Sequence, residues 1–249
     1  MREALAAPTV RRVRPVRFFG AIVLAVTASM HAHAAPISRG ELTALCIEAE
    51  DATQCGRLVE ARQLRSLSRF VERDGNELRI QLVPFGLTTF RDSDGARARS
   101  YAVWDYVPDL ETLVLFTTNG GHNGFMLVQR RGGNEFGIPA EPVFSPDRSR
   151  FVTVDVCERE CDHEVALWRI GPGGVAKEAT WRPPADWVDA SATWRTSGTL
   201  VFDYTTANGG ASHTLERTLA VRARSSLSSR AIHCRASVAD WASASSSAL

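Results

Sequence analysis

The sequence has no excess of charge of either sign and almost no lysine. Its 249 residues include 29 basic and 28 acidic side chains, and lysine occurs once, as Lys177. A balance of this kind is unlike that of a polybasic nucleic-acid binder or an acidic disordered chain. Hydrophobic residues make up 44% of the chain, which is the ordinary share of a globular fold. We therefore expect a folded protein without a nucleic-acid partner.

The sequence also lacks an apolar run of the roughly 20 residues that a membrane-spanning helix needs. The apolar stretch from Phe18 to Met30 follows four arginines and precedes Ala32-His33-Ala34. A basic start, a short apolar run and a small-residue cleavage pattern are the three parts of a secretory signal peptide. Residues 1–34 are therefore predicted to be a signal peptide, and the chain is expected in the periplasm or outside the cell. The segment carries a net charge of +4, so the remaining chain is mildly acidic at −3.

Signatures of common catalytic and nucleotide-binding sites are missing as well. The chain has no G-x-S-x-G elbow, no H-E-x-x-H helix, no P-loop and no G-x-G-x-x-G turn. Paired carboxylates of the glycosidase kind leave no such signature, because the fold rather than the spacing brings them together. We therefore expect a protein that is not an enzyme, with hydrolysis as the remaining catalytic alternative.

Cysteines are present, and their spacing is informative. Cys46 and Cys55 are near neighbours in the sequence, as are Cys157 and Cys161. In an exported chain this spacing predicts two local disulfides, and it leaves the fifth cysteine, Cys234, without a nearby partner.

Residues 35–76 are predicted to form a helical hairpin. Ser38, followed three residues later by Glu41, is a capping box, which is a signature of a helix start. Apolar residues then recur at helical spacing in two stretches, of which the second ends near Val71. The hairpin is expected to cover an exposed face or edge of the β structure that follows.

From Glu77 onward the pattern changes to short runs of β-forming residues separated by turn signals. The turns carry glycine and asparagine, which accept the positive φ angles of tight turns. Many short strands at regular intervals predict a mainly β fold. The predicted strands are Leu78–Val83, Leu87–Phe90, Tyr101–Tyr106, Thr112–Thr117, Phe125–Gln129, Phe151–Val156, Val165–Ile170, Val175–Trp181, Ala192–Trp194, Leu200–Tyr204 and Thr214–Val221.

An internal repeat runs through this β region. Three segments share the order of a strand, a polar loop, a histidine and a second strand. Trp104, Phe144 and Trp194 lead into these segments at intervals of 40 and 50 residues. A unit of roughly 40–50 residues is the blade period of a β-propeller. The segments are residues 112–122, 151–163 and 199–213.

The middle repeat carries a motif. Phe144-Ser145-Pro146-Asp147 precedes an apolar strand, and residues 142–152 resemble the blade motif of TolB-type and related WD-type propellers. The sequence departs from that motif at Arg148, where the family usually has glycine. The layout as a whole also resembles small secreted bacterial proteins with a cysteine-containing helical lead. These resemblances imply export and a propeller-like β fold, and they imply no activity.

The predicted architecture is a propeller-like array of about three four-stranded repeats over residues 77–222, behind the N-terminal helical hairpin. Closed propellers have about 4–8 blades, so three repeats leave an open array whose end strands need cover. The alternatives are a monomer covered by the helices and a homodimer that completes a six-blade ring. Residues 223–249 are rich in serine, alanine and arginine and are predicted to be a disordered tail.

Three histidines occupy corresponding places in the repeats. If the repeats superpose, His122, His163 and His213 lie on one face and form a metal site with an open position. The alternative, which we favour, is that they are polar hairpin residues held apart by neighbouring repeats. Cys157, Cys161 and His163 are a second candidate set of copper or zinc ligands. The disulfide is favoured over this set, because thiolates persist poorly in an oxidising compartment. We expect no cofactor, with a metal as the alternative.

Tryptophans cluster before the last repeat. Trp187 lies beside Asp186 and Asp189 in a proline-bearing segment, and an exposed ring there is a candidate for stacking on a ligand. Its neighbours Trp181 and Trp194 are expected inside the fold.

The sequence therefore predicts an exported, non-catalytic binding or interaction module whose partner is an unidentified protein or small ligand. The alternative is a metal-binding protein or a hydrolase that uses residues on the repeat loops. An enzyme needs acids or histidines that converge in a concave pocket. An interaction module presents an exposed aromatic or apolar patch instead.

Overall fold

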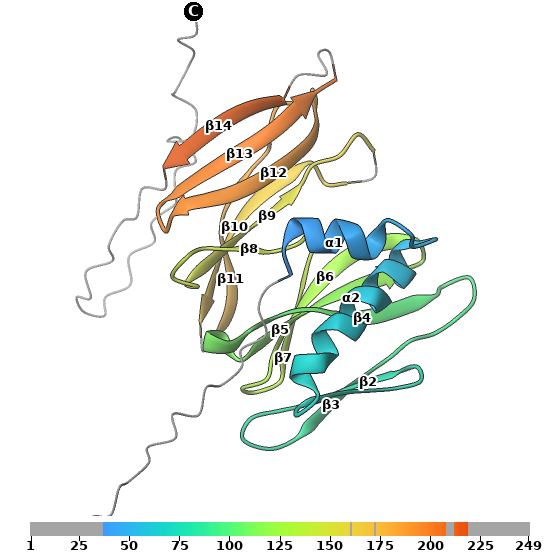
Figure 1. Cartoon of the computed structure of the whole chain (residues 1–249). Helices are drawn as coiled ribbons and strands as arrows, with labels where there is room; N and C mark the ends of the chain where they lie inside the picture. Colours follow the sequence, from blue (N-terminus) through green and yellow to red (C-terminus); the bar gives the residue numbers. More distant parts are fainter. Residues whose placement is uncertain (1–36, 160, 172, 208–211, 219–249) are drawn as a thin grey trace, which may run out of the picture. The chain divides into compact units, whose positions relative to one another are not determined.

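The structure is a computed structural model that describes residues 37–218, apart from residues 160, 172 and 208–211 (Figure 1). The predicted signal peptide, the predicted tail and Cys234 lie outside the described residues. Inside them the fold is mainly β, as expected. No helix of this described part is long and apolar enough to cross a membrane.

Two helices precede the strands, and both begin at the caps that their sequences suggest. α1 (Arg39–Cys46) starts after Ser38, whose side chain accepts a hydrogen bond from the backbone N–H of Glu41 at 3.2 Å. α2 (Ala52–Leu67) starts after Asp51, which accepts from the backbone N–H of Gln54 at 2.7 Å. The second helix ends at Leu67, four residues before the expected end. The first strand begins at Val71 instead.

The strands form four antiparallel sheets, and each sheet uses strands that are consecutive in the chain. The first sheet contains β1 (Val71–Asp74), β2 (Glu77–Gln81) and β3 (Leu87–Arg91). The second contains β4 (Arg99–Val107), β5 (Thr112–Asn119), β6 (His122–Gln129) and β7 (Asn134–Ile138), with the short helix η1 (Pro108–Leu110) between β4 and β5. The third contains β8 (Val143–Phe144), β9 (Arg150–Asp155), β10 (Glu164–Gly171) and β11 (Gly174–Trp181). The fourth contains β12 (Trp187–Thr196), β13 (Thr199–Thr206) and β14 (Ser212–Thr218).

The described residues form four sheets, where the sequence predicts about three four-stranded repeats. The first sheet arises where the sequence suggested the end of the helical hairpin and the start of the first repeat. Two sheets have four strands and two have three, and none of the described sheets closes on itself. The last three sheets begin at residues 99, 143 and 187, so their starts are 44 residues apart.

Apolar cores lie between consecutive sheets. Leu113 and Leu115 of β5 belong to a core shared with the first sheet and α2, whereas Val114 belongs to a core shared with the third sheet. On β9, Phe151 joins that second core, and Val152 joins a third core shared with the fourth sheet. Successive side chains of a strand point to opposite faces. The second and third sheets are therefore buried on both faces, and their central strands are almost continuously apolar.

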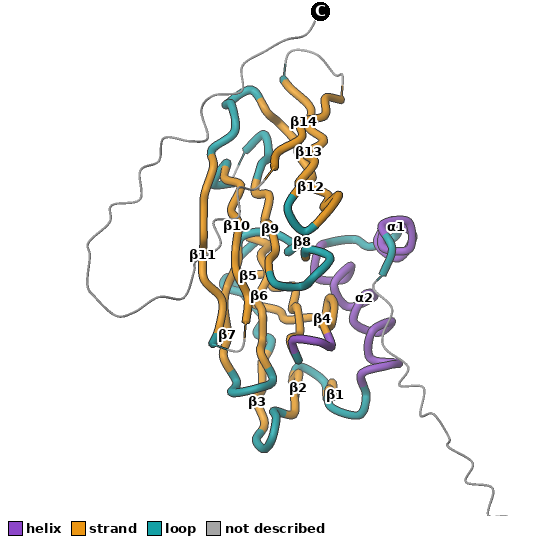
Figure 2. Tube along the Cα trace, turned by 90° about the vertical axis from the view of Figure 1, so that its left-hand side faces the viewer, coloured by secondary structure: helices purple, strands orange, loops and turns teal. Residues whose placement is uncertain are grey.

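α2 covers the free edge of β4, which is the end strand of the second sheet (Figure 2). Gln63 Nε2 donates to the carbonyl oxygen of Trp104 at 2.8 Å, and the backbone N–H of Val103 donates to Glu60 Oε2 at 2.9 Å. These side chains satisfy backbone groups that a neighbouring strand would otherwise pair. The prediction that the hairpin covers an edge of the β structure is confirmed.

Close approach of α2 to the second sheet depends on Gly56. A Cβ atom at this position would lie 2.9 Å from Phe116 Cδ1 and 3.2 Å from Ala102 Cβ. Both neighbours belong to the buried part of the sheet, so neither moves freely. Glycine therefore sets the distance at which the helix packs.

Candidate functional site

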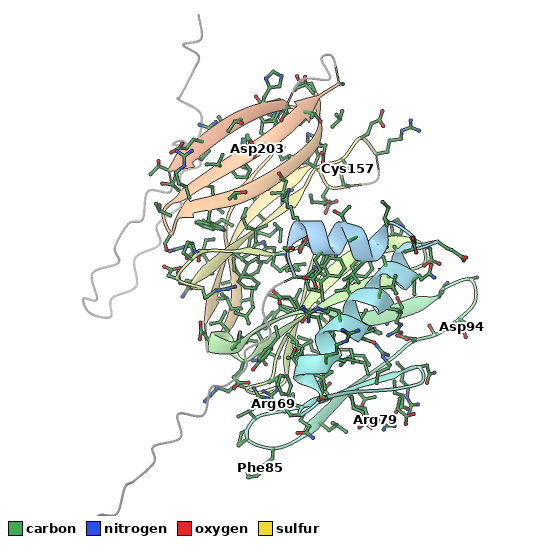
Figure 3. All side chains as sticks on the ribbon, in the orientation of Figure 1. Arg69, Arg79, Phe85, Asp94, Cys157 and Asp203 are labelled. Carbon is green, nitrogen blue, oxygen red and sulfur yellow. A yellow bond between two sulfur atoms is a disulfide. The ribbon has the colours of Figure 1, made fainter. Side chains whose placement is uncertain are left out.

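Both predicted cysteine pairs lie at disulfide distance. Cys46 at the end of α1 is paired with Cys55 in the first turn of α2, and their Cα atoms are 4.8 Å apart. Cys157 and Cys161 are paired in the loop between β9 and β10, with Cα atoms 6.0 Å apart (Figure 3). Metal binding by cysteine needs the free thiolate. A disulfide at this pair closes the loop between β9 and β10 and leaves neither sulfur as a thiolate, so the disulfide and a copper or zinc site with His163 are alternatives.

The three repeat histidines do not assemble into a metal site. Across the described residues, no group of three or more His, Cys, Asp or Glu side chains is placed to hold a metal ion. His122 is exposed at the start of β6. His163 Nε2 lies 3.0 Å from the carbonyl oxygen of Pro184, and the ring of His213 stacks on Tyr204. Each histidine belongs to a different sheet or loop and has its own surroundings.

Trp187 is buried, which corrects its candidacy for stacking on a ligand. Only 4% of its surface is exposed, and its ring stacks on Tyr204 with a centroid distance of 3.6 Å. Trp181 packs edge-on against it at 5.3 Å. The reason is that Trp187 starts β12 and points into the core between the third and fourth sheets. No face of the ring remains for a ligand.

An open groove, here called the α1 groove, is lined by residues of α1, β4, β8 and β12. These four elements are labelled in Figures 1 and 2. The three strands are end strands of their sheets, so one edge of each has no neighbouring strand. The groove has a volume of about 1530 Å³, including the part open to solvent. Its charged lining residues are Arg39, Asp105, Glu141 and Arg148.

An inner pocket continues the groove beneath α1. It has a volume of about 40 Å³ and shares Asp105, Glu141 and Phe144 with the outer groove. Trp104 adds a second aromatic ring. The remaining walls are apolar and are formed by Ile37, Leu42, Val59, Val114 and Pro142.

A β-bulge brings Asp105 into the pocket. The register of β4 against β5 shifts between Val103 and Asp105, so that Trp104 is an extra residue in β4. Bulges bend a strand and redirect its side chains, and they are frequent beside binding sites. Here the bulge places both Trp104 and Asp105 on the lining of the pocket.

Asp105 is a partly buried carboxyl group with few partners. Burial raises its pKa above the usual value, and the nearby charge of Glu141 acts in the same direction. The backbone N–H of Tyr106 donates to Asp105 Oδ1 at 2.8 Å and opposes the rise in pKa, as does the charge of Arg148. No other hydrogen bond to this carboxyl is found in the described part of the chain. Asp105 therefore retains acceptor capacity toward the groove.

Arg148 reaches the groove from the turn of the resembled blade motif. The backbone N–H of Arg148 donates to the carbonyl oxygen of Ser145 at 2.9 Å, which closes the turn. Asp147 Oδ1 accepts from the hydroxyl of Ser149 at 2.9 Å and from its backbone N–H at 3.1 Å. Hydrogen bonds from Ser145 and Ser149 lower the pKa of Asp147. Hydrogen bonds within the turn therefore hold its backbone, and the side chain of Arg148 takes part in none of them and lines the groove.

The backbone conformation of Arg148 shows why glycine is favoured at this position of the turn. Its φ angle is +57°, in the left-handed region that glycine adopts without strain. A residue with a Cβ atom pays roughly 1–2 kcal/mol for this conformation. Arg148 Cζ lies 5.7 Å from the centroid of Phe144, and Arg148 forms no ion pair with any described residue. Non-glycine residues held in such a conformation cluster at functional sites.

Glu141 is the second acid of the groove. Its side chain is exposed, and Trp104 Nε1 donates to Glu141 Oε1 at 2.8 Å. The bond occupies one carboxylate oxygen, and no hydrogen bond to the other is found among the described residues. Glu141 lies in the connection from β7 to β8, so one acid of the pocket comes from a strand and the other from a connection between sheets.

Two clusters of charges elsewhere in the fold are paired. Glu60, 2% exposed, accepts from Arg73 Nε and Nη2 at 2.8 Å each and from Arg57 Nη1 at 3.0 Å. Glu111 accepts from the hydroxyl of Tyr106 at 2.7 Å and pairs with Arg130. Such closed networks hold elements together and have no capacity left for a ligand.

Exposed apolar side chains do not form a second candidate. Phe85 is 89% exposed at the tip of the connection between β2 and β3, and Leu87 follows it at 57% (Figure 3). Isolated exposed apolar residues are normal on protein surfaces.

A second concave surface, lined by Glu72, Arg73, Arg79 and Leu87 among others, lies over the first sheet. Arg73 and Arg79 there are held in ion pairs with Glu60 and Glu77, whereas the α1 groove contains Asp105 and Arg148 without an ion pair.

Comparison with protein-family models and with curated proteins finds no match for this chain. The groove therefore stands on its own geometry. Sequence reasoning used Trp104 and Phe144 as leads into the repeats and named Arg148 as a departure from the motif. It did not join Asp105, Glu141 and Arg148 into one site. The one signal that pointed there was an arginine in a place that favours glycine.

Proposed function

We propose that the chain is an exported, non-catalytic binding module and that the α1 groove is its ligand site. The observation that carries this proposal is the pair Asp105 and Arg148, two opposite charges that line one groove without forming an ion pair. Apolar and aromatic walls surround them. A concave and largely apolar surface with a few convergent polar groups is the usual form of a small-ligand site.

Export is supported by the predicted signal peptide and by the two cysteine pairs at disulfide distance. Disulfides persist in oxidising compartments such as the periplasm or the cell exterior. The succession of four meander sheets supports the propeller-like interpretation within this proposal. Propeller blades present loops and end strands on shared faces that suit binding.

Thermal unfolding in the presence of a library of small polar metabolites tests the groove as a binding site. A ligand that binds only the folded chain raises Tm. We expect the rise to shrink in Asp105→Asn and in Arg148→Gly. Arg91→Ala, at a side chain that is 72% exposed in the first sheet, is the control and keeps the full rise. Equal rises in all four proteins would exclude the α1 groove.

The oligomeric state is tested separately. Size-exclusion chromatography with light scattering distinguishes a monomer from a homodimer, and a single monomeric species at low micromolar concentration excludes the dimer. The groove is lined by one chain, so the proposal of a binding module expects ligand binding by the monomer.

One observation favours a second function, which is hydrolysis by paired carboxyl groups. The raised pKa of Asp105 beside Glu141 is the pattern of a general acid with a neighbouring carboxylate. Release of a chromophore from aryl glycosides, lost in Asp105→Asn and in Glu141→Gln, is the result that this function requires. Absence of turnover together with ligand-induced rises in Tm leaves the binding module.

A further inference from the structure

The charges of the α1 groove are ordered along it. The inner pocket is lined by Asp105 and Glu141, and its lining includes no arginine. Arg148 and Arg39 line the outer groove. Resting on the proposed binding function, we propose that the groove takes a zwitterionic ligand of the amino-acid class, with its ammonium group at Asp105 and Glu141 and its carboxylate at Arg148.

The inner pocket has the groups that recognise a primary ammonium ion. An ammonium group carries three donors, and the two carboxyl groups supply acceptors from different directions. Glu141 uses one oxygen for Trp104 Nε1, and Asp105 receives the backbone N–H of Tyr106. The rings of Trp104 and Phe144 line the same pocket, and aromatic faces attract cations. Carboxylates and aromatic walls together select a cation over a neutral group.

The outer groove has the group that recognises a carboxylate. The guanidinium of Arg148 presents parallel N–H donors that match a carboxylate in a bidentate pair. It forms no ion pair among the described residues, and its backbone is held in the turn that begins at Ser145. Arg39 of α1 adds a second positive charge to the lining. A ligand carboxylate therefore meets a guanidinium that has no competing ion pair among the described residues.

Size and polarity of the two cavities define the rest of the ligand. The inner pocket has a volume of about 40 Å³, which is room for an ammonium group and not for a whole amino acid. The outer groove is larger, and Ile37 and Leu42 form apolar walls of both cavities. The ligand therefore places its ammonium group in the pocket and an apolar side chain, as in leucine, in the outer groove.

Isothermal titration calorimetry with four probes tests the inference: L-leucine, N-acetyl-L-leucine, L-leucinamide and the dipeptide leucyl-leucine. The acetyl group removes the positive charge, and the amide removes the negative charge. We expect L-leucine or the dipeptide to bind at least about tenfold more tightly than either modified form, since each lost contact is a charge-assisted hydrogen bond. The stronger of the two binders distinguishes a free amino acid from a peptide. Equal affinities for L-leucine and N-acetyl-L-leucine would overturn the inference.

Two variants assign the ends of the ligand. Arg148→Gly keeps the left-handed φ without strain, so the fold is retained. This variant should bind L-leucinamide and L-leucine with equal affinity. Asp105→Asn should lose the preference for L-leucine over N-acetyl-L-leucine. His163→Gly is the matched control, because His163 also has a positive φ of 53° and lies outside the groove lining. Loss of discrimination in the control as well would overturn the assignment.

The outcome separates this inference from the proposed function. If none of the four probes binds while library ligands raise Tm in a manner that depends on Asp105 and Arg148, the ligand class is wrong and the groove remains the binding site. If no ligand depends on these residues, both proposals fail. If L-leucinamide and N-acetyl-L-leucine bind with the affinity of L-leucine, the inference of a zwitterionic ligand is wrong and the proposed binding function stands.

Discussion

Two charged regions of this chain differ in how their charges are balanced. Around Glu60, each carboxylate oxygen has an arginine partner, and the cluster fixes α2 to β1 and β4. In the α1 groove, Asp105 and Arg148 share a space without pairing, and the backbone of Arg148 is strained. Paired buried charges serve the fold, since an unpaired one is costly. Charges that the fold leaves unpaired beside a cavity are available to a ligand.

The largest expected loss in free energy of unfolding comes from breaking the ion pairs of Glu60. Glu60→Gln leaves Arg57 and Arg73 without their shared carboxylate in a buried site. Removing one partner of a buried ion pair costs about 3–5 kcal/mol. Urea unfolding measures the loss of free energy of unfolding. Glu77→Gln, at a surface pair with Arg79, is the control and should change stability far less. Equal effects at the two glutamates would contradict the structural role of Glu60.

A smaller effect is expected where α2 packs closest to the sheet. Gly56→Ala puts a Cβ atom 2.9 Å from Phe116 Cδ1, and overpacking should outweigh the gain in helix propensity by about 1–2 kcal/mol. Gly40→Ala in α1 is the matched control, because nothing lies within 4 Å of its Cβ position. The control should be neutral or stabilising. Thermal unfolding of both variants decides, and a stabilised Gly56→Ala would show that the helix can move away.

In the groove, a substitution is expected to raise the free energy of unfolding instead of lowering it. Arg148→Gly relieves the positive φ and removes a charge that pairs with nothing in the fold, so it should stabilise the chain by about 1 kcal/mol. Urea unfolding of Arg148→Gly beside His163→Gly measures this. A clear loss of stability in Arg148→Gly alone would mean that the guanidinium holds the fold, which would remove the contrast between the two regions.

The smallest effect is a dependence on pH. Because burial raises the pKa of Asp105 in the folded chain, the folded state holds this proton to higher pH than the unfolded state does. The group therefore favours folding most at acid pH, and its contribution falls as pH rises from the unfolded pKa, about 3.9, through the folded pKa. Asp105→Asn does not titrate, so its stability relative to the native chain should increase over that range. Urea midpoints from pH 3 to 7 measure the difference, and a flat difference would contradict the raised pKa.

Local features of the fold were predictable from the sequence because local chemistry sets them. The caps at Ser38 and Asp51 and the two cysteine pairs depend on near neighbours in the chain. Each of the predicted strands overlaps a strand of the structure. The missed strands β1, β7 and β8 are polar, interrupted by Gly137 or only two residues long, so they lack an alternating apolar pattern.

The groove was not predictable because three separate events create it. A β-bulge places Asp105 on the lining of the pocket, and the connection between the second and third sheets places Glu141 there. Arg148 lines the groove from a turn in which its own backbone is left-handed. None of these leaves a spacing signature. Trp187 shows the same limit, since its polar neighbours suggested a loop and the start of β12 placed its ring in a core.

The attachment of α1 has a consequence for where the protein can work. α1 has no buried residue, and it is joined to α2 by Cys46–Cys55 and by an ion pair from Arg62 Nε to Glu41 Oε1 at 2.9 Å. This helix carries part of the pocket wall, yet too little apolar surface is buried to hold it there by packing alone. A disulfide is stable in an oxidising compartment and is reduced in a reducing one. The placement of α1, and with it this part of the pocket wall, therefore depends on the redox state of the solution around the chain.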